Sequence, residues 1–244
     1  MRARVAGAAT LWMALGVLGA GPAQAVTCEE IDHLGTPVTV CEVAVAEEKL
    51  DLYLRDAAGR PYGSFDALEE AVGPLPFAMN AGMYHDDRRP VGHYVEDGEE
   101  AMFLVTNPGP GNFGLLPNGV LCLTADRARV IETLRFEAEE PDCEDATQSG
   151  PMLVIDGALH PRFIEGGSSR NIRNGVGTSA DGTVAYFAIA DRPINFHDFG
   201  TLFRDRLGTP NALYFDGNVS RLHAPQLGRS DFGPAMGPIV AVTQ

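Results

Sequence analysis

The chain has 244 residues, with 33 acidic against 18 basic side chains and a formal charge of −15. Such a negative field repels the phosphates of nucleic acids and anionic membrane surfaces, so neither is an expected partner. Beyond the first 25 residues we find no apolar run near the roughly 20 residues that a membrane span needs.

The first 25 residues have the pattern of a secretory signal peptide. Arg2 and Arg4 precede an apolar stretch over residues 5–19, and Ala23-Gln24-Ala25 supplies the small residues of a cleavage site. This order predicts export to the periplasm or the exterior, with cleavage after Ala25. An uncleaved membrane anchor is the alternative, which the short, Ala- and Gly-rich stretch disfavours.

Removal of that segment would leave residues 26–244 as one domain of ordinary size with a formal charge of −17. It contains Cys28, Cys41, Cys122 and Cys143, an even number that is typical of disulfides in an oxidising compartment. Three pairings are possible, and the shorter loops favour Cys28 with Cys41 and Cys122 with Cys143. Metal binding is disfavoured because no C-x-x-C is present.

Short apolar runs punctuated by Gly and Pro predict a strand-rich chain. In chain order we expect strands at 38–45 and 50–54, a helix at 64–72, strands at 75–79, 102–105, 120–123, 152–155 and 183–189, a helix at about 198–207, and strands at 212–215 and 239–242. Asp156-Gly157 and Asp181-Gly182 stand at hairpin positions. The fold class predicted is α+β, a single strand-rich domain with few helices and its catalytic cleft at strand ends.

Asp216 is the first candidate for chemistry because it ends the apolar run 211–215. Gly217 follows it and lets a ligand approach the backbone closely, so the carboxylate would be held rigidly beside a ligand. A turn-forming Asp-Gly without function is an equally good explanation of this feature alone. Ser220 and Arg221 add donors nearby.

Residues 166–175 combine glycines, hydroxyls and the two cations Arg170 and Arg173, followed by Asn174. Backbone N–H groups and guanidinium forks of this kind suit a phosphate. A glycine-rich surface loop with solvated arginines is the commoner explanation. The scarcity of positive charge elsewhere in the chain favours the functional interpretation.

Further polar side chains follow other predicted strands. Asn80, Gly82 and Tyr84 come after the run 75–79, and His93 lies a little further on, so an amide, a phenol and an imidazole could bind a hydroxyl-rich ligand. An Asx-turn with a packed aromatic ring explains them as well. Asp191 ends the run 183–190 and is either a carboxylate in a cleft or a cap for the next helix.

Motifs of nucleotide and metal enzymes are missing from the sequence. We find no HExxH, EF-hand, P-loop, dinucleotide G-x-G-x-x-G or nucleophile-elbow G-x-S-x-G pattern. We therefore expect no cofactor, although a divalent cation held by Asp216 or Asp191 stays open.

Seven short segments occur together in one order: MNAGMY at 79–84, RPVG at 89–92, GNFG at 111–114, LPNGV at 116–120, ATQSGPML at 146–153, IRNGVG at 172–177 and ALYFDG at 212–217. In this combination the chain, from about residue 38 to its C-terminus, resembles the phosphodiester glycosidase domain family. That family includes a bacterial envelope branch described as exopolysaccharide-related and the enzyme that uncovers mannose 6-phosphate on lysosomal proteins.

The resemblance implies hydrolysis of a sugar-1-phosphodiester, so the expected partner is a carbohydrate phosphodiester or glycan. Carried over residue by residue, it places one cleft among Asn80, Gly82, Gly150, Pro151, Arg173, Asp191, Asp216 and Gly217. The family's Asp-Gly-Gly run followed by serines is here Asp216-Gly217-Asn218-Val219-Ser220, a less glycine-rich turn that could change the substrate.

A phosphate monoester leaves more readily than a sugar hydroxyl, so the reaction depends less on a general acid. It needs a cation at the phosphate and one carboxylate at the anomeric carbon. We assign Arg173, aided by Arg170, to the phosphate and Asp216 to the role of nucleophile or general base, with Asp191 as a further catalytic carboxylate. The substrate-binding set completes the hypothesis: Asn80 and Tyr84 on sugar hydroxyls, His93 as a proton carrier, and Gly82, Gly150, Asn174, Gly217 and Ser220 around them.

Two other functions fit the same residues. One is a non-catalytic envelope protein that binds phosphorylated glycans, and the other is a secreted phosphodiesterase that cuts on the far side of the phosphorus. The released product distinguishes the three.

Overall fold

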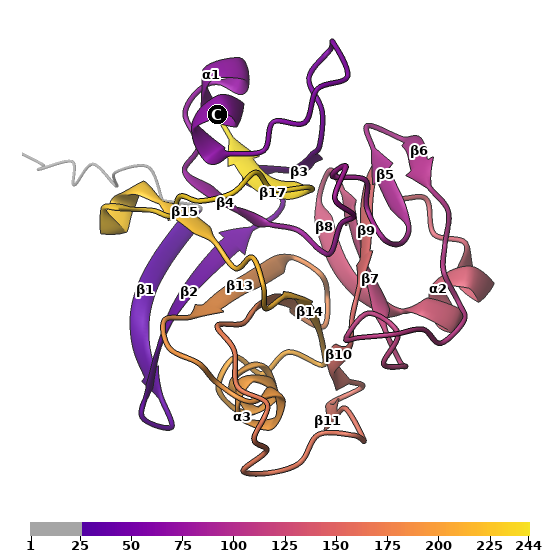
Figure 1. The fold of residues 1–244 in the computed structure, drawn as a ribbon, viewed down its shortest axis with the longest axis vertical. Helices are drawn as coiled ribbons and strands as arrows, with labels where there is room; N and C mark the ends of the chain where they lie inside the picture. The colour runs from indigo at the N-terminus through magenta and orange to yellow at the C-terminus, as the bar shows by residue number, and fades with distance from the viewer. Residues whose placement is uncertain (1–25) are drawn as a thin grey trace, which may run out of the picture.

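The computed structural model describes residues 26–244; the predicted signal peptide falls on residues 1–25, outside the described residues. The α+β class predicted from the sequence is confirmed, because three antiparallel sheets and a few short helices make one domain (Figure 1). None of the helices in residues 26–244 is long and apolar enough to cross a membrane.

The first sheet has seven strands and carries the longest helical segment on one face. Its spatial order is β1 (Val26–His33), β2 (Thr36–Ala44), β13 (Val184–Ala190), β12 (Asn174–Thr178), β14 (Asn211–Asp216), β10 (Met152–Ile155) and β11 (Ala158–Leu159). Helix α3 (Phe196–Thr201) continues into a π-helical turn, η1 (Leu202–Arg206). Phe199 and Phe203 of this segment pack against Leu153 and Tyr214 of the sheet.

The second sheet has five strands, at the top of Figure 1 beside the C-terminus. Its order is β16 (Arg229–Ser230), β15 (Leu222–Ala224), β4 (Phe77–Asn80), β17 (Ile239–Thr243) and β3 (Lys49–Tyr53), and a 3-10 turn, η2 (Pro225–Leu227), joins β15 to β16. Helix α1 (Phe65–Val72) covers one face by packing Phe65 and Leu68 against Ala78 and Ile239.

The third sheet also has five strands and lies on the right of Figure 1. Its order is β6 (Glu99–Met102), β5 (Tyr94–Glu96), β9 (Asp145–Ser149), β7 (Gly119–Thr124) and β8 (Arg127–Glu132). Helix α2 (Thr133–Glu139) packs Phe136 against Val120 and Ile131.

One hydrophobic core joins all three sheets. Phe187 of the first sheet packs against Phe77 of the second with ring centroids 4.7 Å apart and the rings tilted by 38°, and Leu121 of the third belongs to the same cluster. Burying such side chains contributes about 1.5–3 kcal/mol each. The shared core fixes the sheets relative to one another and therefore fixes the loops that leave their edges.

Most of the predicted elements are confirmed within one or two residues. Ser64 caps α1 by accepting a hydrogen bond from Ala67 N at 3.2 Å, and the second helix begins at Phe196, two residues earlier than predicted, capped by Asn195. The strand predicted at 102–105 is wrong, because the backbone N–H and C=O of Val105 bond to the Gln148 side chain instead of a neighbouring strand.

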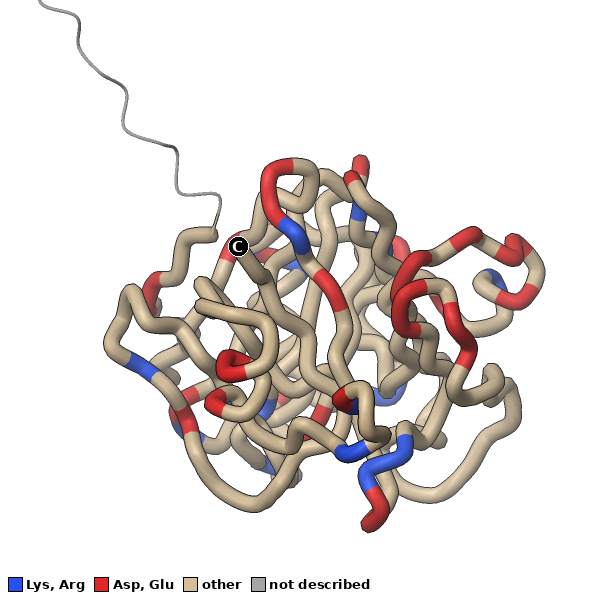
Figure 2. Tube along the Cα trace, turned by 90° about the horizontal axis from the view of Figure 1, so that it is seen from above, with Lys and Arg blue, Asp and Glu red and all other residues tan. Residues whose placement is uncertain are grey.

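Both favoured disulfides are confirmed. Cys28 and Cys41 stand opposite each other on β1 and β2, with Cα atoms 4.0 Å apart. Cys122 of β7 is bonded to Cys143, which follows α2. The acidic positions outnumber the basic ones along the described trace, as Figure 2 shows.

Candidate functional site

Two buried asparagines anchor both ends of the loop between β14 and β15. Asn174, which begins β12, accepts a hydrogen bond from Asp216 N at 3.1 Å through Oδ1. Asn80, which ends β4, accepts one from Arg221 N at 2.9 Å and another from Asn174 Nδ2 at 2.7 Å. Both side chains are fully buried, so they lie beneath the loop and hold it, rather than facing open space.

The loop fixes the carboxylate of Asp216. Its Oδ1 accepts hydrogen bonds from Gly217 N at 2.6 Å and Asn218 N at 2.8 Å. Burial raises the pKa of Asp216, and these backbone N–H groups oppose the rise. Gly217 is required sterically, because a Cβ there would lie 2.2 Å from the Tyr214 hydroxyl.

A cavity of about 420 Å³ lies over this carboxylate, and we call it the Asp216 pocket. It is lined by Met83, Tyr84, Val91, Pro110, Gly111, Asn112, Phe113, Asn171, Tyr214, Asp216, Gly217 and Asn218. Within this lining, drawn from residues 26–244, Asp216 is the one acidic side chain. Phenols and amides beside apolar walls suit a sugar, which presents both hydroxyls and C–H groups.

Arg173 lies behind Tyr214 instead of lining the Asp216 pocket. Its side chain is fully buried and stacks on Phe196, with Cζ 3.5 Å from the ring centroid. Nε donates to Ile194 O at 2.9 Å, whereas Arg173 Nη1 and Tyr214 Oη are buried without a hydrogen-bond partner among the described residues. The sequence predicts that the guanidinium of Arg173 and the carboxylate of Asp216 face one hollow; in the structure they do not, because Tyr214 lines the pocket and Arg173 lies behind it.

Tyr84 forms one wall of the pocket. Its ring packs against Gly237, where a Cβ would lie 2.5 Å from Cγ, and its hydroxyl donates to Ala235 O at 3.3 Å. Burial raises the pKa of Tyr84, the charge of Asp216 adds to the rise, and Arg88 and Arg221 oppose it. Tyr84 is therefore within electrostatic range of both Asp216 and Arg221.

Asp191 lies in a neighbouring hollow of about 350 Å³, which we call the Arg221 pocket. It is lined by Ile172, Ile189, Ala190, Asp191, Ser220, Arg221, Arg229, Ser230, Asp231 and Phe232. Asp191 pairs with Arg229 Nη1 at 2.6 Å and accepts from Thr39 Oγ1 at 3.2 Å. Ser220 borders this pocket while its hydroxyl donates to the backbone oxygen of Ile172 at 3.0 Å.

The remaining predicted site residues lie outside the lining of both pockets. His93 directly precedes β5 of the third sheet, with Nδ1 3.1 Å from Met102 O, and burial lowers its pKa. Gly82 approaches Thr147, Gly150 approaches Asn118, and Arg170 is exposed with Nε donating to Pro193 O at 3.3 Å.

Four residues around Asp216 have no role that the sequence assigns to them. Asn112, Asn171 and Tyr214 line its pocket, and the sequence marks Arg221 only as a nearby donor. Asn112 and Tyr214 stand inside segments of the family resemblance, which was the available signal, whereas Asn171 stands just before one of them.

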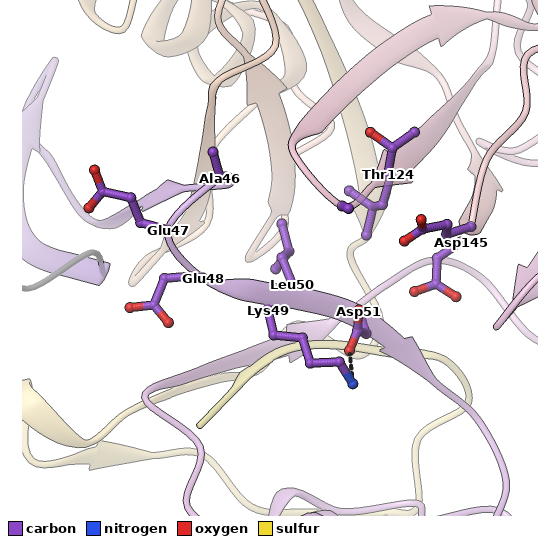
Figure 3. A pocket seen from close by; sticks show the side chains of 11 residues that line it. Ala46, Glu47, Glu48, Lys49, Leu50, Asp51, Thr124 and Asp145 are labelled. Atoms are coloured by element: carbon purple, nitrogen blue, oxygen red, sulfur yellow. Dashed lines mark ion pairs between the residues drawn. The ribbon is translucent and has the colours of Figure 1, made fainter.

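A third hollow, of about 330 Å³, is strongly acidic (Figure 3). Glu47, Glu48, Asp51 and Asp145 line it, and Lys49 Nζ pairs with Asp51 at 2.8 Å. Its carboxylates are spread around the opening in Figure 3. Nowhere in residues 26–244 do three His, Cys, Asp or Glu side chains come together in a group that could hold a metal ion.

Comparison with known proteins identifies the family of the chain. The model of the phosphodiester glycosidase family matches residues 75–224, which include β4, β12, β14 and the loop after Asp216. The chain belongs to the phosphodiester glycosidase family. The uncharacterized protein YigE of Escherichia coli (strain K12) is 32% identical over 179 residues, covering 72% of this chain and 70% of YigE.

Two solved structures share the architecture at low sequence identity. The catalytic domain of zebrafish N-acetylglucosamine-1-phosphodiester alpha-N-acetylglucosaminidase, auto-inhibited by its pro-peptide, superposes with a TM-score of 0.61 at 13% identity, covering 90% of this chain and 82% of that one. A protein of Burkholderia pseudomallei K96243 described as exported has a TM-score of 0.56 at 11% identity, covering 86% and 74%.

Proposed function

We propose that this protein is an exported hydrolase that cleaves a sugar-1-phosphodiester of the cell envelope or of exopolysaccharide, leaving the phosphate on the other group. Membership of the phosphodiester glycosidase family supports the reaction class. Two disulfides, which persist in oxidising compartments, support export.

The observation that carries the proposal is one buried carboxylate in a sugar-sized pocket. Most glycosidases use two carboxyl groups, one of which protonates a poor leaving group. A phosphate monoester leaves without such help, so a lone Asp216 is sufficient as nucleophile or general base. Its Oδ1 is held by two backbone N–H groups, and Asp216 lines the pocket.

Other side chains complete the proposed site. Tyr84, Asn112 and Asn171 hold the sugar hydroxyls, while Asn80 and Asn174 keep Asp216 in place. We propose that the buried Arg173 acts through Tyr214, whose pKa burial raises while the guanidinium opposes the rise. Stacking behind Tyr214 lets Arg173 add positive potential at the pocket floor without touching the substrate.

The test is a product analysis on a panel of glycosyl phosphodiesters. Wild-type protein should release free sugar, and Asp216→Asn should lower kcat by about 1,000-fold or more while binding persists. Asp142→Asn, an exposed carboxylate outside the pocket, is the matched control and should leave the rate unchanged.

Each other outcome contradicts the proposal in a different way. Sugar phosphate as the product would identify a phosphodiesterase that cuts beyond the phosphorus. Thermal stabilisation by the panel without any product would identify a glycan-binding protein.

A further inference from the structure

Arg221 is a cation without a partner in a protein where positive charge is scarce. It is only 7% exposed, yet its guanidinium forms neither an ion pair nor a hydrogen bond with any residue of 26–244. In the same pocket, Arg229 is neutralised by Asp191 at 2.6 Å and Asp231 at 2.9 Å. A mostly buried charge is costly unless it is paired, so Arg221 points to an anionic ligand.

The guanidinium is held in a fixed place. Its backbone N–H donates to Asn80 Oδ1, and its head packs against Gly233, where a Cβ would lie 2.5 Å from Nη2 and 2.9 Å from Cζ. The side chain is therefore pre-organised before a ligand arrives, which reduces the entropy lost on binding.

Arg221 lines the Arg221 pocket, and its charge reaches Tyr84 in the wall of the Asp216 pocket. The short loop 217–220 connects it to Asp216, and Tyr84 is within range of both charges. A sugar in the Asp216 pocket would carry its phosphate toward Arg221. The group on the other side of that phosphate would then occupy the Arg221 pocket.

The outer edge of the Arg221 pocket is apolar. Phe232 is 96% exposed, the most exposed of the large apolar side chains in residues 26–244, and Ile172 on the same pocket is also exposed. Neither side chain can donate or accept a hydrogen bond to a second sugar, but both gain from covering a hydrocarbon chain.

We propose that Arg221 binds the substrate phosphate and that the Arg221 pocket takes an apolar aglycone, so the substrate is a glycosyl phosphodiester of a lipid-like alcohol. This inference rests on the proposed function. When the bond from the anomeric carbon to the phosphate oxygen breaks, its electron pair stays on that oxygen. Water supplies the hydroxyl on the sugar, and its remaining proton is released or taken up by the phosphate monoester.

The charge change explains why a cation is useful there. The diester carries one negative charge, and the monoester leaving group carries about 1.5 to 2 at neutral pH. A fixed guanidinium therefore binds the departing phosphate more strongly than the bound diester, which lowers the barrier.

The first experiment measures binding without turnover, by calorimetry with methyl phosphate and octyl phosphate. Octyl phosphate should bind more tightly than methyl phosphate. Arg221→Gln should weaken both by about 10- to 100-fold, because it removes a charged hydrogen-bond donor. Phe232→Ser should weaken octyl phosphate alone by about 5- to 30-fold. Arg162→Gln and Phe103→Ser, exposed residues outside both pockets, are the matched controls.

Two further variants keep the result interpretable if Arg221→Gln folds poorly. Arg221→Lys retains the charge without the planar fork, and Gly233→Ala retains Arg221 but displaces its head. Equal binding of octyl phosphate to wild type and to all three variants would overturn the phosphate site. Equal affinity for the methyl and octyl compounds would overturn the apolar aglycone.

The second experiment separates this inference from the proposed function. Sugar release from an octyl glycosyl phosphodiester should fall about 100- to 1,000-fold in Arg221→Gln. Full release of sugar by that variant would rule out the role of Arg221 in the reaction, while the proposed hydrolase function would stand. The opposite result is also informative. If octyl phosphate binding depends on Arg221 but wild type releases no sugar, the proposed hydrolase function is overturned and the anion site stands.

Discussion

At the scale of single residues, the pair Asn80 and Asn174 determines where Asp216 and Arg221 lie. Each amide both accepts and donates: Asn174 Nδ2 donates to Asn80 Oδ1 at 2.7 Å, and each Oδ1 also accepts a loop N–H. A carboxylate of the same shape has no N–H to donate, and an apolar side chain has neither group. The site therefore depends on two residues that have no exposed surface.

We predict that Asn80→Ala lowers the free energy of unfolding by about 2–4 kcal/mol and weakens activity. The backbone N–H of Arg221 and the amide of Asn174 would both lose an acceptor, and each unsatisfied buried group costs about 1–3 kcal/mol. Urea unfolding measures the change. Asn107→Ala, at an exposed loop position, is the control. A midpoint equal to wild type would show that the loop does not need this anchor.

At the scale of secondary-structure elements, a carboxylate of the third sheet accepts a hydrogen bond from the edge strand of the second sheet. Strand β3 is an edge strand, and its Leu52 N donates to Asp145 Oδ2 at 3.1 Å. Asp145 Oδ1 also accepts from Asp97 N at 2.9 Å, and Glu96 Oε2 accepts from the Tyr94 hydroxyl at 3.0 Å. An exposed strand edge is thereby blocked against pairing with other chains.

This junction makes stability depend on pH. Burial raises the pKa of Glu96 to about 7 and that of Asp145 to about 6, above their ordinary values. The folded state therefore holds protons that the unfolded state has released. The resulting stability is fully present below about pH 4 and is lost as the pH rises through 6 and 7.

We predict that Glu96→Gln loses less stability than wild type between pH 5 and pH 8, because glutamine mimics the protonated acid at every pH. Thermal unfolding of both proteins across this range measures the difference. Glu99→Gln, on the neighbouring strand β6, should follow the wild-type curve. Parallel curves for Glu96→Gln and wild type would refute the titration of this junction.

At the scale of the whole molecule, one core joins the three sheets, while one disulfide links two strands of the first sheet and the other ties β7 of the third to the segment after α2. Export would account for the oxidised cysteines, since cytosolic thiols are kept reduced. We predict that the protein recovered from the periplasm or medium begins at Val26 and has no free thiol.

Intact mass with and without thiol alkylation tests both statements at once. A mass that retains residues 1–25 would contradict cleavage, and alkylation of unreduced protein would contradict the disulfides. Reduction of the Cys122–Cys143 bond should lower the free energy of unfolding by about 3 kcal/mol, as expected for cysteines 21 residues apart. Unchanged stability after reduction would show that the folded chain does not need this link.

The sequence by itself determined the elements whose signals are local. Ser64 with the apolar spacing after it predicted α1, and Asp156-Gly157 predicted the hairpin of β10 and β11, because capping and tight turns involve only neighbouring residues. Short loops likewise favoured the two disulfides that form. The run ending in Asp216, together with six other segments, was sufficient for the family.

Only the tertiary structure decided which side chains face the same space. Asn80 and Asn174 are 94 residues apart yet share hydrogen bonds. Arg173 directly precedes β12 and Asp216 ends the neighbouring strand β14, yet the two side chains are separated by Tyr214. The sequence places Arg221 near Asp216 as a donor, but its lack of an ion-pair partner had no local signal, since Asp191 and Asp231 neutralise Arg229 instead. Such pairings depend on how three sheets pack on one core, and no spacing along a single strand records that packing.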